Sequence, residues 1–315
     1  MIKTLLRLVV SVALLAFVLR SIDVAALWLR VRGMHSGWLA LAVATYASTL
    51  VVSVWRWERL LHAQHIDVGR RHLHESMWVS TFFNNFLPSN IGGDVIRIAD
   101  TAAAAGSKTV ATTVVVADRA LGLVAVVLVA TISTLAAAAV GIHIPGARWL
   151  WLASFAVTVA AAAAIALPRL VGHMLAPVRA LDRPWLTERA ERLEDALLKF
   201  RAAPAAIVFA FVGAIVVQVA LVTFYLLAAR SLAVPLPVLL GAVLIPVSFV
   251  IQMVPVSVNG FGVREAVFAF FFARFGLPTD GAVALSLVAT GLIMAVSLAG
   301  GLVFLTRGRR TSGSG

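Results

Sequence analysis

The sequence reads FLPSNIGGDVIR at residues 86–97 and MVPVSVNGFGVRE at residues 253–265, and these two stretches decide the fold. Each lies within an otherwise apolar region, approximately 77–99 and 236–275, and interrupts it with Pro, Gly, Asn and charged residues. A simple membrane-spanning helix does not tolerate such interruptions, because unpaired backbone groups are costly in hydrocarbon. We therefore expect two broken or re-entrant helical segments.

The two stretches also match each other at a fixed offset. Identical residues recur 167 positions apart, in the pairs Pro88 and Pro255, Gly93 and Gly260, and Arg97 and Arg264. A second match joins LLHAQHIDV from Leu60 to LLAARSLAV from Leu226, at an offset of 166. Interruptions at corresponding positions of two halves are typical of transporters built as inverted repeats, whose substrate sites lie near the membrane midplane. We expect inverted-repeat halves at approximately 37–140 and 204–306.

Composition places the chain in a membrane. Of its 315 residues, 61% are hydrophobic and 13% are charged, which is more apolar than a water-soluble domain of this size requires. Six uninterrupted apolar stretches are candidate spans, at 4–19, 37–55, 109–140, 148–168, 204–229 and 281–306. We predict an all-α polytopic membrane protein of about six to eight transmembrane helices. A single transmembrane domain over 1–310 would be followed by a flexible tail, 311–315.

The charge distribution predicts the orientation. The 26 Lys and Arg residues exceed the 14 Asp and Glu residues, for a net charge of +12, and basic residues are retained on the cytoplasmic side of membrane proteins. They concentrate in the loop 56–71, the segment 169–201 and the tail 307–310. We expect these regions and both termini on the cytoplasmic face of a bacterial inner membrane, with an amphipathic surface helix at 181–200. The charge therefore requires no nucleic acid partner.

Ionisable residues inside apolar segments are candidate functional residues, because each costs a few kcal/mol at mid-bilayer unless it is paired or lines a polar cavity. There are three acids and three bases: Asp94, Arg97, Asp118, Arg119, Arg264 and Glu265. Asp118 and Arg119 are adjacent on a helix and point to different faces, so each needs a partner elsewhere. The guanidinium groups of Arg97 and Arg264 suit phosphate. The alternative is that the six form structural ion pairs.

Neutral residues of the two broken segments complete the predicted substrate site. Asn85 and Asn259 could bond freed backbone groups or sugar hydroxyls, and Gly93 and Gly260 would let backbone N–H groups approach an anion. The sequence contains no Cys, which excludes thiolate metal sites and Cys nucleophiles. No nucleotide-binding loop, zinc motif or nucleophile elbow is present, so we expect no metal, no cofactor and no enzyme activity.

With these residues identified, the chain resembles the lysylphosphatidylglycerol synthase transmembrane family, also called the flippase-like domain family. The motifs that carry the resemblance are FLPSNIGGDVIR at residues 86–97, ADRALGL at 117–123 and VPVSVNGFGVRE at 254–265. The resemblance implies a domain that moves a lipid across the inner membrane, an aminoacylated phospholipid in the best-known members. Those members continue into a soluble aminoacyl-transferase domain, whereas this sequence ends a few residues after its last predicted span.

Three functions fit the sequence. The first is a transporter of a phosphate-bearing, aminoacylated or glycosylated lipid, with the arginines binding the headgroup and one half rocking against the other. The second is a membrane-embedded transferase on a lipid-linked substrate, with Asp94, Asp118 or Glu265 as general base. The third is a scaffold for a partner lipid-modifying enzyme. Expected partners are membrane lipids, a separately encoded lipid-modifying enzyme and a second copy of the chain.

Overall fold

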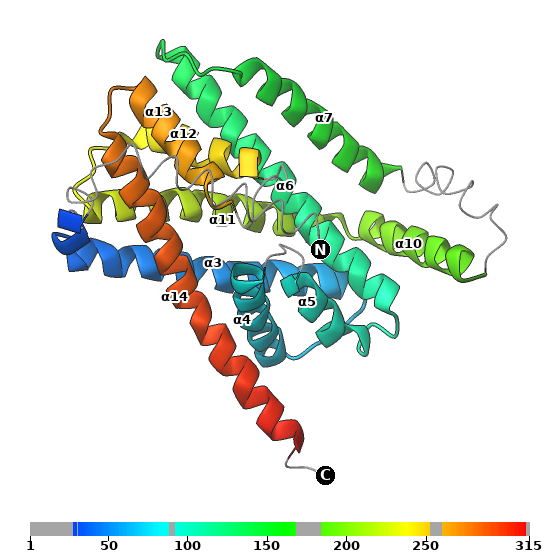
Figure 1. The fold of residues 1–315 in the computed structure, drawn as a ribbon. Coiled ribbons are helices and arrows are strands. Elements are labelled where there is room, and N and C mark those ends of the chain that lie inside the picture. Colours follow the sequence, from blue (N-terminus) through cyan, green and yellow to red (C-terminus); the bar gives the residue numbers. More distant parts are fainter. Residues whose placement is uncertain (1–27, 30, 88–91, 168–183, 253–259, 313–315) are drawn as a thin grey trace.

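The computed structural model describes residues 28–29, 31–87, 92–167, 184–252 and 260–312 (Figure 1). Within these ranges ten complete α-helices are delimited, and residues 28–29 and 31–32 are also helical. The all-α prediction is therefore confirmed for the described part of the chain.

Five of the described helices are long and apolar enough to cross a membrane. They are α3 (Ser36–Ala63), α6 (Lys108–Ala139), α7 (Ala147–Ala166), α11 (Pro204–Ser231) and α14 (Thr279–Ser312). These helices confirm five of the six uninterrupted spans, and the sixth, 4–19, lies outside the described residues. The prediction that Arg56 belongs to a loop is wrong, because α3 continues past it to Ala63. Likewise α14 runs two residues into the predicted tail, to Ser312.

Each interrupted segment contains two shorter helices, the first ending at the start of its motif and the second beginning within the motif. They are α4 (Arg70–Phe86) and α5 (Gly92–Ala102) in the first segment, and α12 (Val238–Gln252) and α13 (Val263–Arg274) in the second. Each pair forms a helical hairpin, in which the second helix folds back along the first. His72 Nε2, near the start of α4, lies 3.2 Å from the carbonyl oxygen of Asp100, near the end of α5. Similarly, a Cβ on Gly281, after α13, would lie 3.2 Å from Val234, before α12.

Local sequence signals explain several helix starts. The Ser107 hydroxyl accepts a hydrogen bond from the backbone N–H of Thr109 at 3.2 Å, which caps α6. Pro204 occupies the first turn of α11, where its missing N–H costs nothing. The carboxylate of Glu265 accepts from the backbone N–H of Gly262 at 2.6 Å, which caps α13.

The helices repeat in order and in approximate length. Helices α3, α4, α5 and α6 contain 28, 17, 11 and 32 residues, and α11, α12, α13 and α14 contain 28, 15, 12 and 34. Helices α3 and α11 lie side by side and antiparallel at the centre (Figure 1). At one end His35 N–H donates to the Ser231 carbonyl at 2.9 Å, and at the other Trp55 packs against Gly213. Across the two halves, α4 packs against α14 and α6 against α12.

Helix α14 packs closely against α4 at Gly300. A Cβ at this position would lie 1.9 Å from the carbonyl oxygen of Trp78, so only glycine permits the observed separation. Further along α14, Arg307 Nη1 lies 3.0 Å from Asp100 Oδ2 and links α14 to α5. The two halves are therefore joined by close packing and by an ion pair along the same helix.

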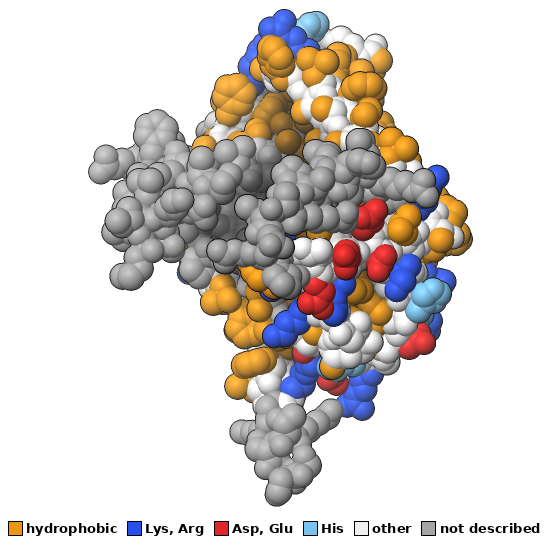
Figure 2. All heavy atoms as spheres, turned by 90° about the vertical axis from the view of Figure 1, so that its right-hand side faces the viewer, with side chains coloured by type: hydrophobic (Ala, Val, Ile, Leu, Met, Phe, Trp, Pro, Cys, Tyr) orange, Lys and Arg blue, Asp and Glu red, His pale blue; other side chains and the backbone are white. Residues whose placement is uncertain are grey.

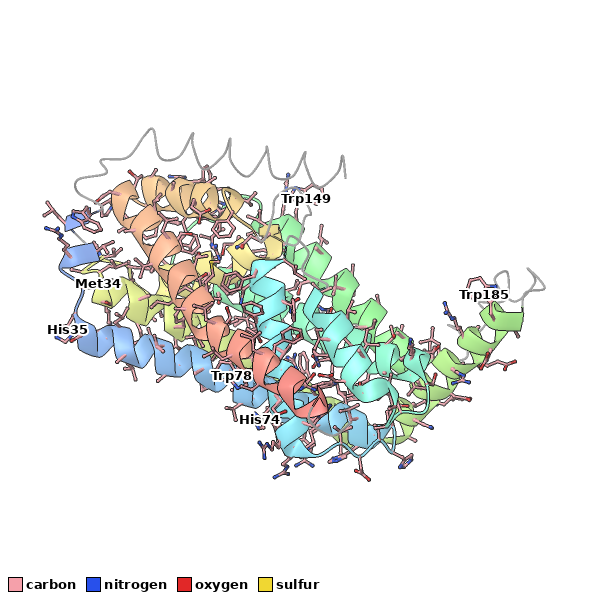
Figure 3. All side chains as sticks on the ribbon, turned by 60° about the horizontal axis from the view of Figure 1, so that its bottom comes forward. Met34, His35, His74, Trp78, Trp149 and Trp185 are labelled. Carbon is pink, nitrogen blue, oxygen red and sulfur yellow. The ribbon has the colours of Figure 1, made fainter. Side chains whose placement is uncertain are left out.

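Helices α7 and α10 (Pro184–Ala202) lie at the periphery (Figure 1). Trp149 and Trp185, near their starts, lie away from the central helices and are 64% and 50% exposed (Figure 3). Helix α10 confirms that 184–200 of the predicted stretch 181–200 is helical, and residues 181–183 lie outside the described residues. On the face shown in Figure 2, most charged side chains gather below a mainly hydrophobic upper part. This segregation matches a surface that is partly in lipid and partly in water.

Candidate functional site

A cavity of about 480 Å³ lies between α3, α4, α5 and α6 of the first half and α11 and α12 of the second. Its charged lining residues are Arg56, Asp94, Arg97, Asp118 and Arg119. Its neutral polar lining residues are Ser53, Ser80, Thr81, Asn84, Asn85 and Gln218. The remaining lining residues are Tyr46, Leu50, Met77, Gly122, Leu123, Val126, Leu221 and Phe249.

The lining changes from charged to apolar along the cavity. The C-terminal part of α3 lies beside the N-terminal part of α6 (Figure 1), so the charged residues of both helices are at the same end. Along α3 the lining runs from Arg56 to Tyr46, and along α6 from Asp118 to Val126, which corresponds to about 15 Å and about 12 Å of helix. One cavity can therefore hold a charged group and an apolar group of the same molecule.

Asp118 lies at the charged end, between two arginines from other helices. Its Oδ1 accepts a hydrogen bond from Arg56 Nε at 2.6 Å, and its Oδ2 lies 2.9 Å from Arg97 Nη2. All three residues are at least nine-tenths buried. The Arg97 guanidinium also stacks over Trp57, with its Cζ 4.3 Å from the ring centroid. Trp57 is fully buried, unlike the exposed tryptophans near the starts of α7 and α10.

A second ion pair joins Arg119 on α6 to Asp94 in the first turn of α5. A carboxylate at this position also interacts favourably with the amino end of the helix. Asp118 thus pairs with α3 and α5, and Arg119 pairs with a different residue of α5, because neighbours on a helix point in different directions. With three arginines and two aspartates, the charged end carries a formal charge of +1.

Arg97 has unused hydrogen-bonding capacity. Within the described part of the chain its Nε has no hydrogen-bond partner, and its Nη2 approaches Asp118 as an ion pair without hydrogen-bond geometry. Because the side chain is only 5% exposed, water compensates little for these donors. Arg97 is therefore suited to receive an oxyanion in the cavity.

The two predicted glycines pack closely against the preceding helix of their hairpin. A Cβ on Gly93 would lie 2.2 Å from the carbonyl oxygen of Ser80, and the Gly93 N–H already donates to Asn84 Oδ1 at 2.9 Å. Gly260 has a φ of +77°, and a Cβ there would lie 2.2 Å from Gln252 Oε1. Both glycines thus allow the hairpins to close.

Of the two asparagines predicted for the site, only Asn85 lies among the described residues. Asn85 lines the cavity, donates from Nδ2 to the Thr81 carbonyl at 3.0 Å and hydrogen-bonds the side chain of Tyr46. Asn259 lies outside the described residues.

Arg264 and Glu265 form a separate buried cluster on α13 and α14. Arg264 Nε donates to Ser286 Oγ at 3.1 Å, and the Ser286 hydroxyl donates to Glu265 Oε1 at 2.7 Å. Neither Arg264 nor Glu265 is among the residues that line the cavity. The structure therefore brings four of the six predicted ionisable residues together and leaves these two apart.

Arg56 is not identified as a site residue from the sequence, because the uninterrupted apolar stretch 37–55 ends just before it. A usable signal was present. Tyr46, Thr49, Ser53 and Arg56 are three or four residues apart, and this spacing places four polar side chains on one face of a helix.

Comparison with known proteins completes the description of the site. No curated protein matches the chain. Residues 4–301 match the family described as "Lysylphosphatidylglycerol synthase TM region", which extends over all the helices that form the cavity. The chain is therefore a multi-span membrane protein that belongs to the lysylphosphatidylglycerol synthase TM region family.

Proposed function

We propose that the protein transports a phosphate-bearing lipid across the bacterial inner membrane. The observation that supports this function is the change from charged to apolar lining within one cavity. A lipid headgroup would lie between Arg56, Arg97 and Arg119, and the first part of its hydrocarbon would lie along the apolar end. A volume of about 480 Å³ is within the usual range of small-molecule sites, so it fits a headgroup rather than a whole lipid.

Arg97 is the principal headgroup ligand in this proposal. It is buried, it lines the cavity, and its Nε has no hydrogen-bond partner in the described part of the chain. Asp118 holds its guanidinium in place and is itself held by Arg56. We assign Arg264 and Glu265 a structural role, because they bond Ser286 and so attach α13 to α14.

An inverted repeat would supply the motion. Two observations support it: the recurring helix order and the antiparallel packing of α3 against its counterpart α11. The arginine partners also correspond. Arg97 pairs with Asp118 on α6, and Arg264 pairs with Ser286 on α14. Ser286 follows Asp118 by 168 positions, close to the offset of 167 that separates the two arginines. Rocking of one half against the other would expose the cavity to each leaflet in turn.

The membrane topology follows from the same arrangement. If each hairpin returns to the side from which it enters, α4 with α5 and α12 with α13 are re-entrant and do not add a crossing. The five long helices together with the predicted span 4–19 then give an even number of crossings. Both termini would lie in the cytoplasm, where the basic segments concentrate.

No chemical step belongs to this function. The three candidate general bases are all engaged within the protein, because Asp94 pairs with Arg119, Asp118 with two arginines, and Glu265 with Ser286 and a backbone N–H. A separately encoded enzyme would make or consume the lipid.

Leaflet exchange of fluorescent lipids in reconstituted liposomes tests the function. We expect Arg97→Ala to abolish exchange and Arg97→Lys to retain part of it, since lysine keeps the charge but loses the planar donors. The matched control is Arg71→Ala, because Arg71 is an exposed arginine outside the cavity. It should exchange lipid like the parent protein.

Exchange that persists in a folded Arg97→Ala protein would refute the assignment of the cavity. No exchange of any lipid by the parent protein, with or without a proton gradient, would favour a scaffold or a transferase instead.

A further inference from the structure

The charged end of the cavity has no carboxylate available for a cation. Asp118 is held by Arg56 and Arg97, and Asp94 is paired with Arg119. These two are the only acids among the described residues that line the cavity. An ammonium group placed here would face three arginines without a free counterion, and a buried unpaired charge is strongly unfavourable. The site therefore selects against headgroups that carry an amine.

The net charge of the cavity lining indicates the charge of the ligand that fits it. The lining carries a formal charge of +1, which one negative charge on the ligand would neutralise. A phosphodiester carries a single negative charge, whereas a phosphomonoester carries about 1.5 to 2 at pH 7. The unpaired Nε of Arg97 supplies a donor for one phosphate oxygen. Charge and donors together fit a phosphodiester.

Neutral polar groups also line the cavity. Ser53, Asn85 and Gln218 line the cavity from three different helices. Gln218 Oε1 is buried and has no hydrogen-bond partner in the described part of the chain. A buried acceptor without a donor is unfavourable, and a ligand hydroxyl would satisfy it.

Resting on the proposed transport function, we infer that the substrate is a phosphodiester lipid whose headgroup beyond the phosphate is neutral and carries hydroxyl groups. Arg97 binds the phosphate, with Arg56 and Arg119 beside it, and Gln218 accepts a hydrogen bond from a headgroup hydroxyl. Lipids with an aminoacyl headgroup are rejected, because their ammonium has no counterion in this cavity.

Binding measurements on the full-length protein in neutral detergent micelles test this inference without requiring transport. The probes are phosphatidylglycerol, its lysyl ester and phosphatidylmethanol, a phosphodiester without headgroup hydroxyls. We expect phosphatidylglycerol to bind about tenfold more tightly than the lysyl ester, and more tightly than phosphatidylmethanol by a smaller factor. Equal or tighter binding of the lysyl ester would overturn the inference.

A gain-of-function variant adds a second test. Gln218→Glu adds a carboxylate to the cavity at nearly constant shape, so it should strengthen binding of the lysyl ester and weaken binding of phosphatidylglycerol. The matched control, Gln218→Met, removes the acceptor without adding charge. It should weaken phosphatidylglycerol binding and leave lysyl ester binding weak. Identical lipid preferences in Gln218→Glu and Gln218→Met would contradict the electrostatic basis of selection.

The outcomes separate the inference from the function on which it rests. If the lysyl ester binds best and Arg97→Ala abolishes its binding, the cavity is a lipid site but the substrate class is wrong. If none of the three lipids binds while the protein still exchanges another lipid between leaflets, the substrate class alone is refuted; if it exchanges no lipid, the function is refuted as well.

Discussion

Replacing Asp118 by Asn should destabilise the protein by about 3 to 5 kcal/mol, as expected when one partner of a buried ion pair is removed. The side chain keeps its shape but loses the charge that holds Arg56 Nε at 2.6 Å and Arg97 Nη2 at 2.9 Å. Each attraction is worth roughly 4 kcal/mol at an effective dielectric constant of about 20. Relief of the desolvation of one carboxylate offsets part of that sum.

The measurement is equilibrium unfolding by SDS in mixed micelles, followed by tryptophan fluorescence. The control is Asp100→Asn, the same substitution in a more exposed pair, where Asp100 Oδ2 lies 3.0 Å from Arg307 Nη1 and the two side chains are 19% and 22% exposed. Such a pair is worth about 1 kcal/mol or less. The two substitutions should therefore differ by a factor of about three or more in their effect on the free energy of unfolding.

A second substitution tests the cause. Adding Arg56→Met to Asp118→Asn removes one of the two cations left without an anion, and it should restore about 1 kcal/mol or more. If Asp118→Asn costs no more than Asp100→Asn, or if Arg56→Met lowers stability further in the Asp118→Asn background, then charge burial does not hold α3, α5 and α6 together. The basis of the proposed headgroup site would then be incorrect.

Two other predictions concern the contact between the halves. Gly300→Ala should destabilise the protein by about 1 to 3 kcal/mol or more, because its Cβ would lie 1.9 Å from the Trp78 carbonyl oxygen. Gly291→Ala is on the same helix, but its Cβ would meet no other described residue within 4 Å, so it should be neutral or slightly stabilising in the same unfolding assay. Arg307→Ala should lower stability by about 1 kcal/mol or less while it changes the rate of lipid exchange, since it removes the ion pairs of α14 with Asp100 and with Glu75. An unchanged exchange rate would show that these ion pairs do not restrain the motion.

Membrane physics made several features readable from the sequence alone. Apolar runs of sufficient length predicted α3, α6, α7, α11 and α14, because backbone groups in hydrocarbon must be paired within a helix. The Pro and Gly interruptions predicted where the remaining helices break for the same reason. A charge in an apolar segment marked Arg97 and Asp118 as residues that need a partner or a cavity.

Which residues pair with these buried charges depends on tertiary packing. Asp118 contacts Arg56, 62 residues earlier in the chain, and nothing in the sequence near either residue specifies that contact. Repeat symmetry grouped Arg97 with Arg264, yet Arg97 lines the cavity and Arg264 bonds Ser286 elsewhere. The sequence determined that buried charges would need compensation, because the cost of burial depends on residue type and depth. Only the packing of α3, α5 and α6 decided which charges meet, because ion pairing requires contact within a few ångströms between side chains from different helices.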